Sequence, residues 1–178
     1  MRVIGGRFRS RRLKSVPGLA VRPTPDRLRE ALFNVLAPRL EAAIFVDAYA
    51  GSGAVGIEAL SRGASRVFLI ERNQQALAVI EQNLRSLGIG KEVTVLRGRA
   101  ALLLRECSAD IVFLDPPYED AGEYENSLSA IATTACPLVI AQHARRFTLA
   151  DAYGDLHKTR DLSQGDNSLA FYSRAATT

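Results

Sequence analysis

The sequence contains no tryptophan, one methionine, two cysteines and two histidines among its 178 residues. Cys107 and Cys136 match no metal-ligand spacing, and His143 and His157 are isolated, so we expect no metal site and no disulfide. The sequence also lacks any apolar run of about 18 residues, the length of a membrane span. Because the Arg-rich start has no apolar signal-peptide core either, a cytoplasmic protein is expected.

Acidic residues are scarce near the N-terminus, where the positive charge is concentrated. Residues 1–30 hold nine basic residues against Asp26 and Glu30, a balance of +7, which leaves −3 for the other 148 residues within the net charge of +4. The nine are Arg2, Arg7, Arg9, Arg11, Arg12, Lys14, Arg22, Arg27 and Arg29. Such a basic segment on a mildly acidic body is typical of proteins that bind phosphate groups. As a charge run alone, it fits a solvated tail equally well.

The order of apolar runs predicts the fold class. Hydrophobic residues make up 47% of the chain and charged residues 24%, the balance of a globular domain. Short apolar runs alternate with helical patterns, which indicates a mostly parallel sheet covered on both faces, with strands at 44–47, 67–70, 93–96, 110–114 and 138–141. Two weaker strands near 155–161 and 168–173 lie too close for a helical crossover, so we expect an antiparallel hairpin at the sheet edge. The prediction is α/β, doubly wound, with a mostly parallel seven-stranded sheet.

Local signals mark the ends of segments. Thr24 is the predicted N-cap of the first helix, Pro25 suits its first position, and Pro38 is expected to end it. Asn73 is predicted to cap a later helix that Gly88 terminates. Residues 1–22 are expected to form a short basic extension, an arm or a hairpin, ahead of a single domain at 23–178.

A glycine-rich segment follows the first strand and reads Asp47-Ala-Tyr-Ala-Gly51-Ser-Gly53-Ala-Val-Gly56. Glycines there let the backbone turn tightly and approach a ligand at the carboxyl edge of the sheet. The carboxylate of Asp47 can receive the ammonium group of S-adenosylmethionine but would repel a pyrophosphate. Glu71 ends the second strand, 20 residues beyond Gly51, where it can accept both ribose hydroxyls. From the loop alone, NAD binding or a packing role for the glycines stays open.

The fourth strand runs directly into Asp115-Pro116-Pro117-Tyr118. Two successive prolines give a stiff turn with few internal donors, so carbonyl oxygens can point outward. Hydrogen bonds from an exocyclic amine to the Asp115 carboxylate and the Pro116 carbonyl would localise the nitrogen lone pair for attack on a sulfonium methyl group, and Asp115 can take the released proton. Tyr118 offers a flat face for base stacking. The motif predicts amino-group methylation, although Pro-Pro by itself also fits a stiffened loop with a core tyrosine.

Three further pieces, together with this motif, resemble a known family. They are Arg2-Val-Ile-Gly-Gly6, Arg22-Pro-Thr-Pro-Asp-Arg-Leu-Arg-Glu30 and Ala50-Gly-Ser-Gly-Ala-Val-Gly-Ile-Glu-Ala-Leu-Ser-Arg62. In this order they resemble RsmD-type guanine-N2 methyltransferases of small-subunit ribosomal RNA, over nearly the whole chain. The resemblance implies a class I Rossmann-like methyltransferase fold, S-adenosylmethionine as cofactor, and 16S rRNA within the small subunit or an assembly intermediate as partner. We further expect a monomer that does not bind membranes.

The resemblance also implies roles for individual residues. The base would be held by Asp115, Pro116, Pro117 and Tyr118. The cofactor would be bound by Asp47, Gly51, Gly53, Glu71, Arg72, Arg99, Ala100, Asp115, Thr24 and Arg27, and the RNA by Arg7, Arg9, Arg11, Arg12 and Lys14. One departure concerns the position after the third strand, where many relatives in the wider class place Asp or Asn. This chain has Arg99 there, whose side chain cannot accept a hydrogen bond, so the cofactor adenine is expected to contact backbone groups around Arg99 and Ala100.

Other substrates stay open at this stage. The same cofactor could serve adenine N6 in DNA or RNA, or a glutamine amide in a protein, although the basic segment argues against a protein substrate. A non-catalytic RNA-binding factor on the same fold would not need an intact Asp115-Pro-Pro-Tyr118 motif. Carbon-5 methyltransferases are excluded because they need a cysteine nucleophile. The loop after the fourth strand has none, and Cys136 precedes Pro137 at the start of a strand.

Overall fold

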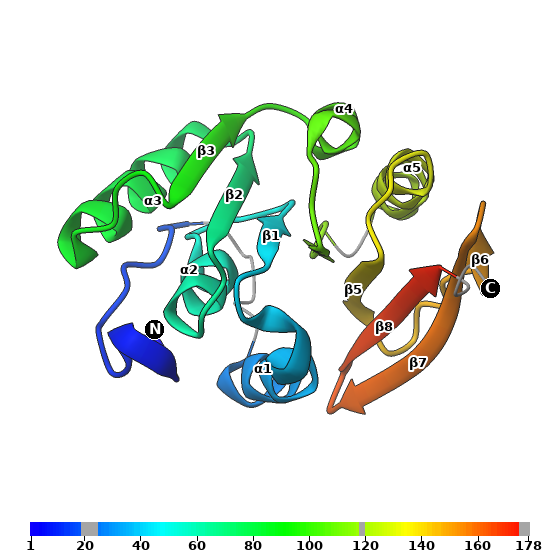
Figure 1. The fold of residues 1–178 in the computed structure, drawn as a ribbon, viewed down its shortest axis with the longest axis horizontal. Coiled ribbons are helices and arrows are strands. Elements are labelled where there is room, and N and C mark those ends of the chain that lie inside the picture. The colour runs from blue at the N-terminus through cyan, green and yellow to red at the C-terminus, as the bar shows by residue number, and fades with distance from the viewer. Residues whose placement is uncertain (19–24, 118–119, 175–178) are drawn as a thin grey trace.

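The computed structural model describes residues 1–18, 25–117 and 120–174. Within them, one eight-stranded sheet has the order β3-β2-β1-β4-β5-β8-β7-β6 (Figure 1). Neighbours among β1 to β5 pair in parallel, and β6, β7 and β8 pair antiparallel. The strands are β1 Ile44–Asp47, β2 Arg66–Glu71, β3 Val93–Arg97, β4 Ile111–Leu114, β5 Leu138–Ala144, β6 Ala152–Tyr153, β7 Leu156–Gln164 and β8 Asn167–Arg174.

The doubly wound α/β class is confirmed, whereas the prediction of seven strands is wrong by one. The additional strand is β6, whose two residues pair with β7 across a turn in which Gly154 has a φ of +58°. Two residues are too few to produce a periodic apolar pattern, so periodicity cannot reveal such a strand. The predicted antiparallel hairpin is β7–β8, but β8 lies inside the sheet, between β5 and β7.

Helices cover both faces of the sheet (Figure 1). They are α1 Asp26–Leu40, α2 Ala54–Ser61, α3 Gln74–Leu87, α4 Ala100–Leu103 and α5 Ala121–Ala132, with 3₁₀ turns η1 Gly6–Phe8 and η2 Leu104–Glu106. Strand residues alternate between two apolar cores, since Phe45 joins the core under α1, α2 and α3 while Val46 joins the core under α4 and α5. In the described part of the chain, no helix combines the length and apolar character needed to cross a bilayer.

The observed helix ends show which of the predicted capping and stop residues are correct. Asn73 caps α3 by accepting hydrogen bonds from two backbone N–H groups of the first turn, and Gly88 ends it in the left-handed conformation, both as predicted. The predicted cap of α1, Thr24, lies outside the described residues. Pro38 does not end α1, which continues to Leu40. A proline in the last turn removes only one helical hydrogen bond, and Leu40 is packed at 1% exposure.

Residues 1–14, here called the N-terminal hairpin, fold back on themselves and pack against the helices. Backbone N–H groups of Val3 and Leu13 donate to the carbonyls of Arg11 and Met1, each at 3.0 Å. The side chains of Val3 and Leu13 are buried in the core shared with α1 and α2. The hairpin therefore belongs to the folded body, next to α2 and α3 in Figure 1.

Candidate functional site

The glycine loop between β1 and α2 lies at the carboxyl edge of the sheet and is shaped by left-handed backbone. Gly51 and Gly53 have φ values of +55° and +80°, which only glycine adopts at low cost. The Gly51 N–H donates to Glu71 Oε2 at 2.8 Å, which ties the loop to the end of β2. A Cβ placed on Gly51 would meet no heavy atom of the described residues within 4 Å. The loop therefore presents open backbone at Gly51, as a ligand site requires.

Gly56 has a different role from Gly51. A Cβ placed on it would come within 2.3 Å of Leu69 Cδ2 and 3.0 Å of Val67 Cγ1. The side chain is missing here because α2 packs directly on β2. The packing interpretation of the glycine pattern thus applies to Gly56, while the ligand interpretation fits Gly51.

Asp47 ends β1 as a buried carboxylate, 2% exposed, whose Oδ2 accepts a hydrogen bond from Gly56 N at 3.0 Å. Burial, and after it the negative charge of Glu71, raises the pKa of Asp47 to about 7. Among the described residues no lysine or arginine forms an ion pair with it. A buried carboxylate that lacks a cationic partner is suited to a cationic ligand group.

Glu71, the last residue of β2, organises the backbone around it. Its Oε1 accepts from the N–H groups of Arg72 and Asn73, both at 2.8 Å, while Oε2 holds Gly51. A carboxylate has about four acceptor positions, so three backbone bonds leave capacity for a ligand hydroxyl. The loop that follows β3 is also joined to the end of β2, because Gly98 N donates to the Glu71 carbonyl at 3.1 Å.

The predicted adenine contacts follow Gly98. Arg99 occupies the N-cap position of α4, with an exposed side chain, and its carbonyl accepts from Leu102 N at 3.2 Å. Ala100 is 4% exposed. Arg27 is exposed in the first turn of α1, and Thr24 lies outside the described residues. The structure thus brings Asp47, Gly51, Gly53, Glu71, Arg72, Arg99 and Ala100 to one edge of the sheet.

The Asp115-Pro116-Pro117 segment leaves β4 at the same edge, next to β1. Asp115 is half-buried, Pro116 is buried and Pro117 is exposed, while Tyr118 lies outside the described residues. The Pro117 carbonyl accepts a hydrogen bond from Asp120 N at 3.0 Å. Asp120 in turn caps α5, its Oδ1 accepting from Glu123 N at 3.2 Å. The loop is thereby anchored to the start of α5.

A polar cluster that the sequence did not indicate joins the glycine loop to α5. The Tyr49 hydroxyl donates to Glu123 Oε2 at 2.8 Å and lies 2.7 Å from Ser127 Oγ. Glu123 also forms an ion pair with Arg72, with Nη1 and Oε1 3.5 Å apart. Burial, and the hydrogen bond to the Glu123 carboxylate, raise the pKa of Tyr49. The only signal in the sequence was an aromatic residue inside a glycine loop.

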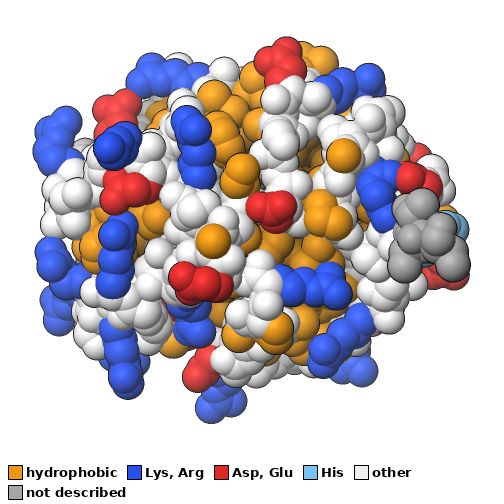
Figure 2. Space-filling view, viewed as in Figure 1, with side chains coloured by type: hydrophobic (Ala, Val, Ile, Leu, Met, Phe, Trp, Pro, Cys, Tyr) orange, Lys and Arg blue, Asp and Glu red, His pale blue; other side chains and the backbone are white. Residues whose placement is uncertain are grey.

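The predicted RNA-binding residues lie along the N-terminal hairpin and the adjoining side of α3. Three of them contact the body: Arg7 pairs with Glu92 at 3.3 Å, Arg11 donates to the Ser86 carbonyl at 3.0 Å, and Lys14 donates to Gln82 at 2.8 Å. Arg9 and Arg12 are exposed, and within the described chain their side chains have no hydrogen bond or ion pair. Figure 2 shows Lys and Arg side chains gathered on the side that carries the hairpin and α3.

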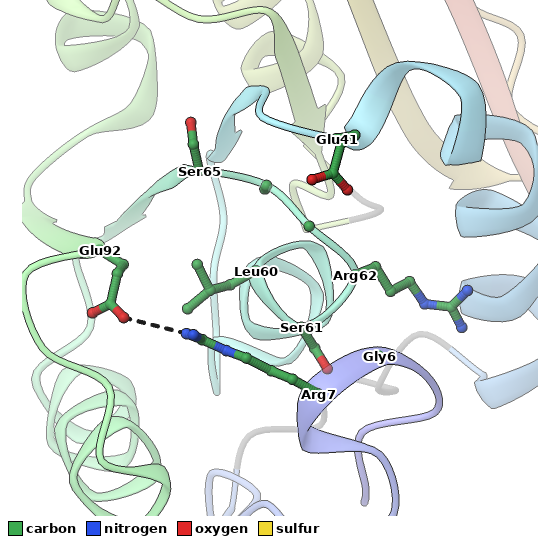
Figure 3. Close-up of a pocket in the computed structure, with 10 residues that line it drawn as sticks. Gly6, Arg7, Glu41, Leu60, Ser61, Arg62, Ser65 and Glu92 are labelled. Carbon is green, nitrogen blue, oxygen red and sulfur yellow. Dashed lines mark hydrogen bonds and ion pairs between the residues drawn. The ribbon is translucent and has the colours of Figure 1, made fainter.

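A hollow of about 480 Å³ opens between the hairpin and the C-terminal end of α2 (Figure 3). Its charged lining is mixed, with Arg7 and Arg62 beside Glu41 and Glu92, and Arg7 reaches Glu92. The hollow lies at the opposite end of α2 from the glycine loop. It is therefore separate from the cluster of predicted cofactor residues.

Comparison with known proteins gives consistent matches. The model of a family described as "Conserved hypothetical protein 95" matches residues 1–173. The chain is 35% identical to the "Putative rRNA methyltransferase YlbH" of Bacillus subtilis (strain 168), over 98% of this chain and 99% of that protein. It is 41% identical over 119 residues to "Ribosomal RNA small subunit methyltransferase D" of Escherichia coli (strain K12), a match that covers 66% of this chain and 60% of the relative.

The solved structure titled "Putative methyltransferase yhhF from Escherichia coli" superposes with a TM-score of 0.87 and 33% identity, over 99% of each chain. These matches confirm the resemblance to RsmD-type enzymes that the motifs indicated, and they confirm the Rossmann-like fold. They span the hairpin as well as the sheet, since the family match begins at residue 1.

Proposed function

Because the chain belongs to the family described as Conserved hypothetical protein 95, we propose that it transfers a methyl group from S-adenosylmethionine to the exocyclic N2 of a guanine in 16S rRNA. Two of its matched relatives are named as rRNA methyltransferases. The observation that carries the proposal is the buried Asp47 carboxylate, free of any ion pair in the described chain, beside the open backbone of Gly51. A site of this kind accommodates a ligand with a cationic head group.

The residues present fit this cofactor. Asp47 would receive its ammonium group, Glu71 a ribose hydroxyl, and the backbone at Arg99 and Ala100 its adenine. When bound, the cofactor supplies an electrophilic sulfonium methyl group. Gly51 would allow close approach, because its α-carbon faces open space.

The base would be held by the segment that leaves β4. Asp115 and the Pro116 carbonyl would accept hydrogen bonds from the guanine amino group, which localises the nitrogen lone pair. Asp115 would then take the released proton, directly or through water. Tyr118 would stack on the extruded base, as the sequence predicts. The anchoring of this segment to α5 through Asp120 supports a fixed position for these acceptors.

The reaction itself is tested by incubating the protein with S-adenosylmethionine that carries a labelled methyl group and with small subunits that lack the modification. Nucleoside analysis should identify N2-methylguanosine. N6-methyladenosine as the product would contradict the guanine assignment and support the alternative amine. Cofactor and RNA binding without any transfer would instead favour a non-catalytic RNA-binding factor.

The proposed role of Asp115 is tested by Asp115→Asn, which keeps the size of the side chain but removes the proton acceptor. Methyl transfer should fall on the order of 10²- to 10⁴-fold, the usual contribution of a positioned general base. An unchanged thermal unfolding midpoint would show that the fold is retained. Transfer at the rate of the unmodified protein would overturn the assigned role.

A further inference from the structure

Asn83 is a buried polar residue on a face of α3 that otherwise carries apolar side chains, and its amide joins two segments far apart in the sequence. Its Oδ1 accepts from Lys14 N at 2.8 Å. Its Nδ2 donates to the Lys14 carbonyl at 3.1 Å and to the Ser52 carbonyl at 2.9 Å. The residue is 1% exposed. Since both amide atoms have backbone partners, this one side chain bonds the hairpin directly to the glycine loop.

The two backbone segments that Asn83 connects each lie next to a proposed binding site, one for the cofactor and one for RNA. Ser52 stands between Gly51, whose backbone faces open space, and Gly53. Lys14 follows the basic residues of the hairpin, and its own Nζ reaches the surface, where it meets Gln82 at 2.8 Å. Rearrangement of Lys14 on RNA binding would therefore act directly on the amide that positions the cofactor loop.

We propose that Asn83 couples the two sites, so that RNA bound at the N-terminal hairpin raises cofactor affinity. The inference rests on the proposed function. A ligand at one end orders a backbone segment that the amide holds, and the second ligand then meets a loop that is already ordered and loses less entropy. The coupling is reciprocal, so the cofactor raises RNA affinity by the same factor. Asn83 is a positioning residue that touches neither ligand.

The test measures the dissociation constant of S-adenosylhomocysteine, which does not react, with and without saturating small subunits that lack the modification. For the unmodified protein the ratio of the two constants should be about fivefold or more, within the usual range of coupling between sites. A ratio of one with both ligands bound would overturn the coupling while leaving the proposed function intact. Absence of cofactor or RNA binding would overturn both.

Asn83→Asp keeps an acceptor for Lys14 N but replaces the donor with an oxygen that faces two carbonyls, so the ratio should fall to about one. Asn83→Ala removes all three bonds and provides a second variant if the first is poorly folded. Gln82→Ala is the matched control on the same helix, because it removes only the exposed hydrogen bond with Lys14 Nζ. Its ratio should equal that of the unmodified protein. A retained ratio in both Asn83 variants would show that the residue has only a structural role.

Discussion

Two buried carboxylates lie at α2: Glu58 belongs to the C-terminal half of the helix, and Asp47 lies against its first turn. Glu58 is saturated by protein groups, since it accepts from Ile4 N at 2.7 Å, Gly5 N at 2.8 Å and Arg62 Nε at 2.6 Å. It also lies 3.9 Å from the buried guanidinium of Arg29.

Asp47 receives only backbone N–H groups, has no ion pair among the described residues, and has its pKa raised to about 7. A buried carboxylate that is fully paired holds the hairpin to the body, whereas one without a cation stays suited to a ligand. The C-terminal end of the helix therefore anchors the hairpin, and its first turn lies at the proposed cofactor site.

The largest effect is expected from Glu58→Gln, which removes one of the two carboxylate charges that compensate Arg29, the other being that of Asp26. Removing one partner of a buried charge pair costs about 3–5 kcal/mol, so the free energy of unfolding should fall by that amount. Urea unfolding followed by circular dichroism measures it. A loss below about 1 kcal/mol, the level of a surface ion pair, would show that the cluster is not structurally important.

The same chemical change at the other end, Asp47→Asn, should have the opposite effect on stability. The substitution removes a buried charge that has no partner, so the free energy of unfolding at pH 8 should rise by about 1–2 kcal/mol. Replacing a residue that serves function at a cost in stability commonly has this effect. Affinity for S-adenosylhomocysteine should fall about tenfold or more, because the ammonium group loses its partner. Calorimetric titration measures this affinity, and equal affinity in both proteins would contradict the ligand role.

The raised pKa of Asp47 predicts how both properties vary with pH. In the unfolded chain the carboxyl group titrates near pH 4, so the native protein binds the proton more tightly and loses stability as the pH rises from about 4 to 7. Cofactor affinity should have the opposite pH dependence. It should fall by up to tenfold for each pH unit below 7, because Asp47 becomes protonated. Asp47→Asn should remove this dependence.

A ligand control separates Asp47 from other titrating groups. 5′-Methylthioadenosine lacks the amino-acid part of the cofactor, so its affinity should stay flat between pH 6 and 8. A parallel decline for both ligands would assign the pH dependence to a different residue.

The smallest effect on stability is expected at Arg9 and Arg12, the exposed hairpin residues whose side chains have no partners in the described chain. Replacing both with Gln should change the free energy of unfolding by no more than about 0.5 kcal/mol. The slope of RNA affinity against salt should fall by about one for each phosphate that the variant no longer neutralises. Arg39→Gln, at the far end of α1, is the matched control on an exposed arginine. Equal slopes in all three proteins would exclude Arg9 and Arg12 from the RNA interface.

The structure also changes how the hairpin can be tested. Deletion of residues 1–20 would remove Val3 and Leu13 from the core and leave Glu58 without two of its donors. Such a truncation would lower stability as well as charge. Single charge substitutions keep the two contributions apart.

The parallel half of the sheet could be predicted because its strands are short, continuous apolar runs ending in carboxylates, as at Asp47 and Glu71. The antiparallel half was harder. β7 exposes most of its side chains and therefore has a polar pattern, and β6 has only two residues. An apolar periodicity appears in the sequence only where side chains are buried, and neither β6 nor β7 buries enough side chains to produce one.

Within the site, the sequence identified residues that follow strands but not those that connect segments. Asn83 was hidden because a single polar residue on an apolar helical face does not reveal which distant backbone it bonds. Tyr49 and Glu123 come from elements 74 residues apart, and their contact depends on how α5 packs. Spacing predicts which groups reach the carboxyl edge, whereas tertiary packing decides which of them support one another.

The inner position of β8 has a consequence for synthesis of the protein. β5 pairs with β4 on one side and with residues 167–173 on the other, and Arg174 donates to the carbonyls of Ile131, Ala132 and Cys136. During translation the outer edge of β5 therefore stays unpaired until these late residues have left the ribosome. β4, which leads to Asp115, is the neighbour of that uncovered strand throughout this interval.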